Sequence, residues 1–184
     1  MTLYFVRHGL SEANKQGLWA GGHYETPLSV EGIEQAKIAG SKAAKNNIDF
    51  DLIVSSPRER ALETAKNIAE QVGYPVEKIQ VIDELKERMF GELDGKENID
   101  LGPIHGKDET HVDRFEGVES MADFERRVTN ILAELKKRPE ETILIVSHAA
   151  FGRALKRAVA GVKYDKNAVT SFELIPNAKI VKLI

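Results

Sequence analysis

The sequence contains no cysteine, which excludes disulfide bonds and thiolate chemistry. It has no apolar run that approaches the roughly 20 residues of a membrane-spanning helix. No basic block stands out, and the formal net charge of −3 argues against a general nucleic-acid binder. A cysteine-free chain fits the reducing cytosol, so we expect a cytoplasmic protein with neither a nucleic-acid nor a membrane partner.

The remaining composition is that of one globular domain. With 184 residues, 42% of them hydrophobic and 30% charged, the chain is long enough to bury a large core. Short apolar runs alternate with amphipathic stretches, which predicts strands alternating with helices. We expect strands over 3–6, 51–55, 79–82 and 142–147, and helices over 29–46, 56–73, 120–138 and 149–161. This order predicts a single α/β domain over residues 1–184, built of three layers (α/β/α) around a mostly parallel central sheet.

Local signals place several boundaries in this domain. Ser29, Ser56 and Ser120 stand where helix N-caps are expected, and Pro57 and Glu59 strengthen the second of these starts. Near the end of the chain, segments 171–175 and 179–183 flank Pro176-Asn177-Ala178, which predicts an antiparallel hairpin at the sheet edge. The polar stretch 96–117 is interpreted as a lid-like excursion over that edge.

Polar, chemically active residues follow three of the expected strands. Arg7-His8-Gly9 comes directly after the strand 3–6, and glycine there lets the backbone turn sharply. Arg60 lies in the first turn of a helix that follows the strand 51–55, and His148 follows the strand 142–147. Because parallel strands end at the same edge of a sheet, these residues should meet in one pocket.

Two arginines, two histidines and a helix N-terminus suit a tetrahedral dianion such as phosphate. A metal site would need carboxylates among the histidines, whereas this pocket is cationic. Neutral imidazole is a competent nucleophile toward phosphorus, and phosphoryl transfer depends on positioning and charge neutralisation. Each residue alone has an ordinary structural explanation, as a solvated helix charge or a strand-end histidine, but four such coincidences at strand ends are much less expected.

The order of the motifs resembles that of the histidine phosphatase superfamily, in its phosphoglycerate-mutase-like branch. The resemblance covers nearly the whole chain. It rests on Arg7-His8-Gly9 with Asn14, Gly22 with Thr26-Pro27-Leu28-Ser29, the segment 55–65 around Arg60, Leu85-Lys86-Glu87-Arg88-Met89-Phe90-Gly91, Gly117-Val118-Glu119-Ser120, and Val146-Ser147-His148.

The resemblance implies a role for each matching residue. His8 would be the nucleophile that becomes phosphohistidine, and Glu87 would give a proton to the leaving group. The charge of a bound phosphate would favour the protonated form of Glu87, although its charged surroundings alone suggest a surface carboxylate. The phosphoryl and substrate oxygens would be held by Arg7, Asn14, Gly22, Arg60, Arg88, His148 and Ala149. No metal and no cofactor are implied.

Three positions depart from the family pattern. Ala149 follows the second histidine, where glycine is frequent, so a methyl group would lie close to the phosphate. Glu25 replaces the usual aspartate and Leu93 the usual tryptophan. None of these changes removes a catalytic group, but they leave the substrate open.

The expected function is therefore a phosphatase that hydrolyses a small phosphorylated metabolite through a phosphohistidine. The first alternative is a phosphoglycerate mutase: the pair Glu87-Arg88 resembles mutases, whereas Ala13-Asn14 and the short chain are more phosphatase-like. The second alternative is a non-catalytic phosphate-binding module, against which the retention of His8 and Glu87 argues. A third is a metal hydrolase using His23, His105, His111 and His148. The sequence leaves the oligomeric state open, with a homodimer as one option.

Overall fold

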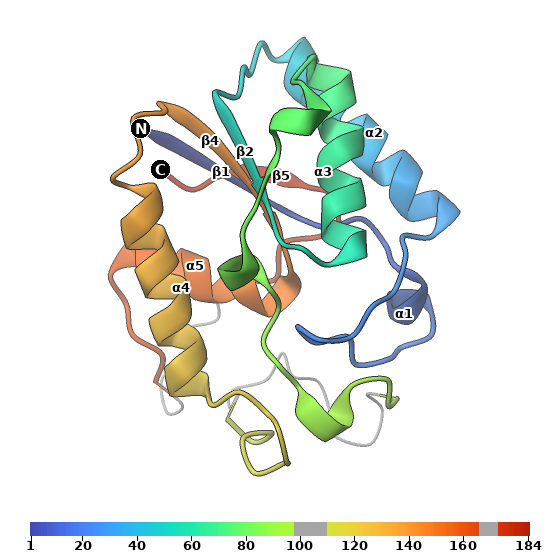
Figure 1. The fold of residues 1–184 in the computed structure, drawn as a ribbon, viewed down its shortest axis with the longest axis vertical. Coiled ribbons are helices and arrows are strands. Elements are labelled where there is room, and N and C mark those ends of the chain that lie inside the picture. Colours follow the sequence, from blue (N-terminus) through green and yellow to red (C-terminus); the bar gives the residue numbers. More distant parts are fainter. Residues whose placement is uncertain (98–109, 166–172) are drawn as a thin grey trace.

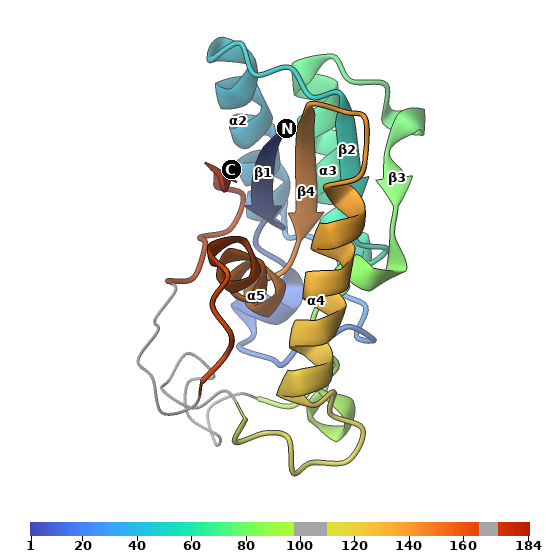
Figure 2. The same ribbon diagram turned by 90° about the vertical axis from the view of Figure 1, so that its left-hand side faces the viewer.

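A five-stranded sheet in the order β3-β2-β4-β1-β5 forms the centre of the molecule (Figures 1 and 2). The computed structural model describes residues 1–97, 110–165 and 173–184. The strands are β1 (Thr2–Arg7), β2 (Leu52–Ser55), β3 (Gln80–Val81), β4 (Thr142–Ser147) and β5 (Ile180–Lys182). The pairs β1–β4, β2–β4 and β2–β3 are parallel, and β5 runs antiparallel to β1. The predicted α/β architecture with a mostly parallel sheet is confirmed.

Helices cover both faces of this sheet (Figure 2). The α-helices are α1 (Glu12–Lys15), α2 (Val30–Lys45), α3 (Glu59–Val72), α4 (Met121–Leu135) and α5 (Ala149–Ala160). The short 3₁₀ helices among the described residues are η1 (Val76–Lys78), η2 (Asp83–Leu85) and η3 (Gly91–Leu93). Helices α2 and α3 pack on one face, and α4 and α5 pack on the other. Over the described residues, no helix combines the length and apolar character needed to cross a membrane.

Strands β1, β2 and β4 are buried on both faces, as their apolar runs predict, whereas the short edge strand β3 is exposed. In β1, Leu3 and Phe5 join the core beneath α4 and α5, whereas Val6 joins the core beneath α2 and α3. This alternation follows from the two-residue period of a strand. Continuous burial fixes the register of β1 and β4, in which Arg7 lies opposite Ser147.

Two of the three expected serine caps are confirmed, and one is wrong. The side chains of Ser29 and Ser120 accept the backbone N–H groups of residues three positions later, as caps do. Helix α3, however, begins at Glu59 rather than beside Ser56. The N–H of Glu59 donates instead to the carboxylate of Glu25 at 3.1 Å, so a residue from a distant loop caps this helix.

The predicted C-terminal hairpin is only half present. Its second arm forms β5, but residues 173–175 are not in a strand, and residues 171–172 lie outside the described residues. Ala178 adopts a positive φ of 51° and donates its N–H to the carbonyl of Arg7 at 2.8 Å. The chain therefore reaches the sheet by bonding to the end of β1. Most of the lid-like excursion, residues 98–109, also lies outside the described residues.

The topology places a switch point where β1 and β4 end. The chain leaves β1 toward α2 on one face and leaves β4 directly into α5 on the other. Such a switch point between neighbouring parallel strands is where open α/β sheets bind their ligands.

Candidate active site

The two predicted histidines meet at this switch point. His8 follows β1, His148 follows β4, and the backbone N–H of His8 donates to the carbonyl of Ser147 at 2.9 Å. The ring centroids lie 5.2 Å apart with the planes at 63°. Both imidazoles are almost fully buried, at 4% and 1% exposure. The convergence that the sequence predicted for these two residues is confirmed.

His8 is a neutral imidazole. Burial is the largest cause that lowers its pKa well below 6.5, and the charges of Arg60 and Arg7 add to it, so the ring is neutral. Its Nδ1 lies 2.7 Å from the carbonyl oxygen of Gly9. Because a carbonyl can only accept, the hydrogen bond assigns the ring proton to Nδ1 and leaves the lone pair on Nε2.

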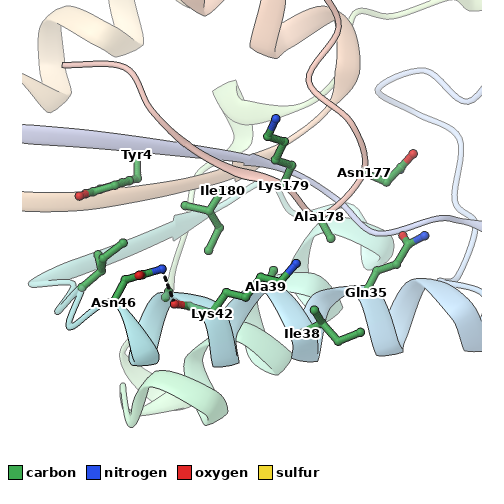
Figure 3. Close-up of a pocket in the computed structure, with 12 residues that line it drawn as sticks. Tyr4, Gln35, Ile38, Ala39, Lys42, Asn46, Asn177, Ala178, Lys179 and Ile180 are labelled. Carbon is green, nitrogen blue, oxygen red and sulfur yellow. Dashed lines mark hydrogen bonds between the residues drawn. The ribbon is translucent and has the colours of Figure 1, made fainter.

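Three side chains fix the loop that carries His8 by hydrogen bonds to its backbone. The N–H of Gly9 donates to Thr64 Oγ1 at 3.0 Å, and that hydroxyl donates to the carbonyl of Arg60 at 2.7 Å. Gln35 accepts the N–H of Leu10, and Asn177 donates to the carbonyl of His8. Gln35 and Asn177 also line a groove of about 530 Å³ between α2 and the C-terminal segment, and Figure 3 shows their side chains there.

His148 is held by a residue that the sequence analysis assigned to a helix cap. Its Nε2 lies 2.8 Å from Ser56 Oγ, and its Nδ1 is buried with no hydrogen-bond partner in the described parts of the chain. Burial, followed by the charge of Arg60 and then those of other nearby cations, including Arg7 and Arg127, lowers the pKa of His148 well below 6.5. A second neutral imidazole therefore faces the first.

The predicted arginines supply the positive charge of the site. Arg60, 1% exposed, donates to the carbonyls of Tyr24, Ala20 and Gly21 at 2.7, 3.0 and 3.2 Å. Burial lowers the pKa of Arg60 to about 10, against the opposing effect of Glu87, and burial lowers that of Arg7 as well. The buried Nε atoms of Arg7 and Arg60 have no hydrogen-bond partner among residues 1–97, 110–165 and 173–184.

Glu87 lies inside the site rather than at the surface. Its carboxylate is 5% exposed and accepts the N–H groups of Ala150 and Phe151, at 2.9 and 3.1 Å, in the first turn of α5. The N–H of Arg88 donates to the same carboxylate at 3.0 Å. The negative charge of Glu87 acts on both Arg7 and Arg60. The surface interpretation of this carboxylate is wrong.

The other predicted binding residues differ in where they lie and in what they contact. The half-buried Asn14 uses Oδ1 in a capping box with Ser11, which leaves its amide N–H groups for other partners. A Cβ on Gly22 would come within 2.5 Å of the carbonyl oxygen of Glu87, so only glycine fits there. Ala149 is the first residue of α5. Arg88 forms an ion pair with Asp113.

Histidines expected by the metal hypothesis are not gathered together in the described residues. His148 lies with Ser56 and His8, whereas the exposed His23 and the half-buried His111 lie in separate turns, and His105 falls outside the described residues. Across the described ranges, no group of three or more histidine, cysteine, aspartate or glutamate side chains could hold a metal ion.

Some functional contacts escaped the sequence analysis. Ser56 looked like a helix cap and Asn177 like a turn residue, and only the tertiary structure brings them to His148 and His8. Thr64 had a local signal, because it lies four residues after Arg60 and so on the same face of α3.

Relatives of this chain include phosphatases and phosphoglycerate mutases, enzymes that act on phosphate esters. A 2,3-bisphosphoglycerate-dependent phosphoglycerate mutase of Brucella melitensis biotype 2 is 31% identical over 170 residues, covering 88% of this chain and 82% of that protein. The adenosylcobalamin/alpha-ribazole phosphatase of Escherichia coli (strain K12) is 34% identical over 156 residues, covering 80% and 73%. Phosphoserine phosphatase 1 of Hydrogenobacter thermophilus is 33% identical over 170 residues, covering 90% and 79%.

Solved structures with a similar fold also include a phosphatase. The structure of mycobacterial glucosyl-3-phosphoglycerate phosphatase in complex with VO3 superimposes with a TM-score of 0.81 at 26% identity, covering 98% of this chain and 90% of that one. The sequence pattern of the histidine phosphatase superfamily (branch 1) matches residues 3–184. With paired histidines at the ends of β1 and β4 and this match over nearly its whole length, the chain belongs to the histidine phosphatase superfamily.

Proposed function

We propose that the protein is a phosphatase that hydrolyses a small phosphorylated metabolite through a phosphohistidine on His8. The observation that carries this proposal is the state of His8, a neutral imidazole with its lone pair on Nε2, buried beside the charges of Arg7 and Arg60. Unprotonated imidazole among fixed cations is the arrangement that attack on a phosphate dianion requires.

The surrounding donors support an oxyanion at this place. Buried polar nitrogens without partners are costly, yet the Nε atoms of Arg7 and Arg60 and the Nδ1 of His148 are such atoms in the described structure. A phosphoryl group would satisfy them. If Ser56 donates its hydroxyl proton to Nε2 of His148, the ring proton lies on Nδ1, ready to donate to a phosphoryl oxygen.

The reaction then has two balanced steps. Nε2 of His8 attacks phosphorus while the bond to the leaving oxygen breaks, and protonated Glu87 gives its proton to that oxygen. Water next attacks the phosphohistidine, Glu87 accepts a proton from the water, and inorganic phosphate leaves with His8 neutral again. Glu87 is suited to both proton transfers because its carboxylate is fixed on the first turn of α5, beside His148.

A phosphatase is favoured over a mutase by the position of Arg88. The pair Glu87-Arg88 was the feature that most resembled the mutases. Arg88 is 1% exposed, its Nε donates to the carbonyl of Glu119 at 2.8 Å, and its guanidinium is paired with Asp113. An arginine engaged in this way supports the fold of the segment rather than binding a substrate carboxylate.

Two measurements test the proposal. Enzyme quenched during turnover should carry a phosphoryl group that is labile in acid and stable in base, on the peptide that contains His8, and a fully active His8→Ala enzyme would refute the mechanism. With 3-phosphoglycerate, release of inorganic phosphate indicates a phosphatase, whereas formation of 2-phosphoglycerate without phosphate release indicates a mutase. A panel of phosphoserine, sugar phosphates and nucleotides then ranks the substrates.

A further inference from the structure

The segment that carries Glu87 has almost no regular structure of its own, yet it is fixed in place. Beyond the short helix η2, its carbonyl groups cannot find partners in a helix or sheet ladder and must find them elsewhere. The carbonyl of Leu85 accepts the hydroxyl of Ser147 at 2.6 Å, and the carbonyl of Arg88 accepts the N–H of Gly22 at 3.1 Å. The carbonyls of Glu84, Lys86 and Glu87 all accept from a single residue, Arg127 of α4.

Arg127 uses all five of its N–H groups in this region. Nη1 donates to the carbonyls of Glu84 and Lys86 at 2.6 and 2.9 Å, and Nη2 donates to that of Glu87 at 3.3 Å. The two remaining N–H groups, on Nε and Nη2, donate to the two carboxylate oxygens of Glu119 at 3.0 and 2.7 Å. The paired side chains are only 16% and 12% exposed, so water competes little for these bonds.

Glu119 fixes the guanidinium of Arg127 and also bonds directly to the segment that carries Glu87. Its backbone N–H donates to the carbonyl of Met89 at 2.9 Å, and the N–H of Met89 donates to its carboxylate at 3.3 Å. The planar fork of arginine fits a carboxylate on one side and carbonyls on the other, whereas the three rotatable donors of lysine cannot reproduce it. The guanidinium plane is further fixed over the ring of Phe124, 5.1 Å from its centroid.

We propose that Arg127, locked by Glu119, is the positioning residue for the general acid, which holds the backbone of Glu87 so that its carboxyl group reaches the leaving oxygen. The carboxylate end of Glu87 rests on α5, and its backbone end is held from α4. These helices pack side by side on one face of the sheet, so the two supports share one rigid frame. This inference rests on the proposed role of Glu87 as the proton donor.

The test uses the dependence of the reaction on the leaving group. An alkoxide must be protonated as it leaves, whereas nitrophenolate leaves without help, so a defect in acid catalysis affects alkyl phosphates selectively. We would measure kcat/KM, which reports the step in which the leaving group departs, for nitrophenyl phosphate and a series of alkyl phosphates. Glu87→Gln sets the reference pattern, and the variants Arg127→Lys, Arg127→Met and Glu119→Gln are compared with it.

We expect Arg127→Met to lower kcat/KM for alkyl phosphates by roughly 10²-fold, since small displacements of a catalytic group have effects of that size. The loss for nitrophenyl phosphate should be much smaller. Arg127→Lys and Glu119→Gln, which keep more of the packing, should show the same selectivity with smaller losses. Each variant in combination with Glu87→Gln should cost no more than Glu87→Gln alone. Arg126→Met is the matched control, because Arg126 neighbours Arg127 on α4 but its side chain is 67% exposed and pairs with Asp123.

The outcomes separate the inference from the function on which it rests. If Glu87→Gln is selective and the Arg127 and Glu119 variants lose activity equally on all substrates, Arg127 has only a structural role and the inference is wrong. If Glu87→Gln itself shows no selectivity, the proposed acid is wrong, and the proposed mechanism falls with it. Should Arg127→Met fail to fold, the milder Arg127→Lys and Glu119→Gln variants decide between these results.

Discussion

Lowering the pH should destabilise this protein through its two buried histidines. In the folded state the pKa values of His8 and His148 are lowered well below 6.5, mainly by burial and also by nearby arginines. In the unfolded chain both rings return to ordinary values and take up protons as the pH falls through about 6.5. The unfolded state then binds more protons than the folded state, so the stability is complete above this pH and is lost below it, down to the folded pKa values.

The size of the effect follows from the number of rings. A neutral buried histidine costs about 1.4 kcal/mol of unfolding free energy for each pH unit below its unfolded pKa. Two such rings should therefore lower the free energy of unfolding by about 3 kcal/mol between neutral pH and about pH 5.5. Urea unfolding at several pH values in this window measures the slope. The buffer must be free of phosphate, which would bind the folded state and mask the loss.

Single variants show which residues produce the slope. His8→Asn and His148→Asn should each remove about half of the pH dependence of the unfolding free energy that the two rings cause. The double variant should remove nearly all of it. His23→Asn is the control for the loss of an exposed imidazole. The reasoning is refuted if the double variant keeps the slope of the wild type, because the acid sensitivity would then come from other groups.

Four further predictions concern the site and its surroundings. Gly22→Ala places a methyl group 2.5 Å from the carbonyl oxygen of Glu87, so kcat/KM for alkyl phosphates should fall by roughly 10²-fold, and unchanged activity would show that the loop yields freely. Ser56→Ala removes the hydrogen bond to His148, worth about 1 kcal/mol, and should lower kcat/KM roughly fivefold; no change would mean that His148 needs no such anchor. Arg88→Met removes a buried guanidinium from its ion pair with Asp113, which is 28% exposed, and should lower the unfolding free energy in urea by about 1–3 kcal/mol without changing the preference among phosphate esters; a lost preference for phosphoglycerates would restore the mutase hypothesis. Finally, activity should survive exhaustive treatment with a chelator, and recovery only on addition of zinc or manganese would contradict the histidine mechanism.

The sequence was sufficient for those parts of the site that depend on the strands. Continuous apolar runs such as 143–146 fix strands buried on both faces, and parallel pairing then brings their ends together. The positions of His8 and His148 follow from this rule alone, because each comes directly after such a strand. Arg60 follows from it less directly, since the short connection 56–58 leaves little freedom between β2 and α3.

The sequence was not sufficient where a polar side chain had several possible partners. Ser56 satisfied every local rule for a helix cap, but its hydroxyl is near His148, and the carboxylate of Glu25 caps α3 instead. The hydrogen bonds of Arg127 join residues some 40 positions apart, a separation at which no local pattern exists. The same limit applies to residues 173–175, whose alternation resembles a strand although their backbone does not pair in the sheet.

One physical difference explains which features the sequence predicted and which it did not, and the same difference shapes the candidate site. Burial of apolar surface is non-directional and is decided by patterns that a sequence displays, so it fixes the sheet and the ends of its strands. Hydrogen bonds to buried polar groups are directional and are decided by whatever lies nearby after the sheet has formed. In this protein nearly every such group around Glu87 is satisfied, whereas Nε of Arg7, Nε of Arg60 and Nδ1 of His148 have no partner in the described structure. The fold therefore holds Glu87, the proposed proton donor, rigidly and leaves buried polar nitrogens without partners where a phosphoryl group would bind in the proposed mechanism, which depends on such fixed positions and charges.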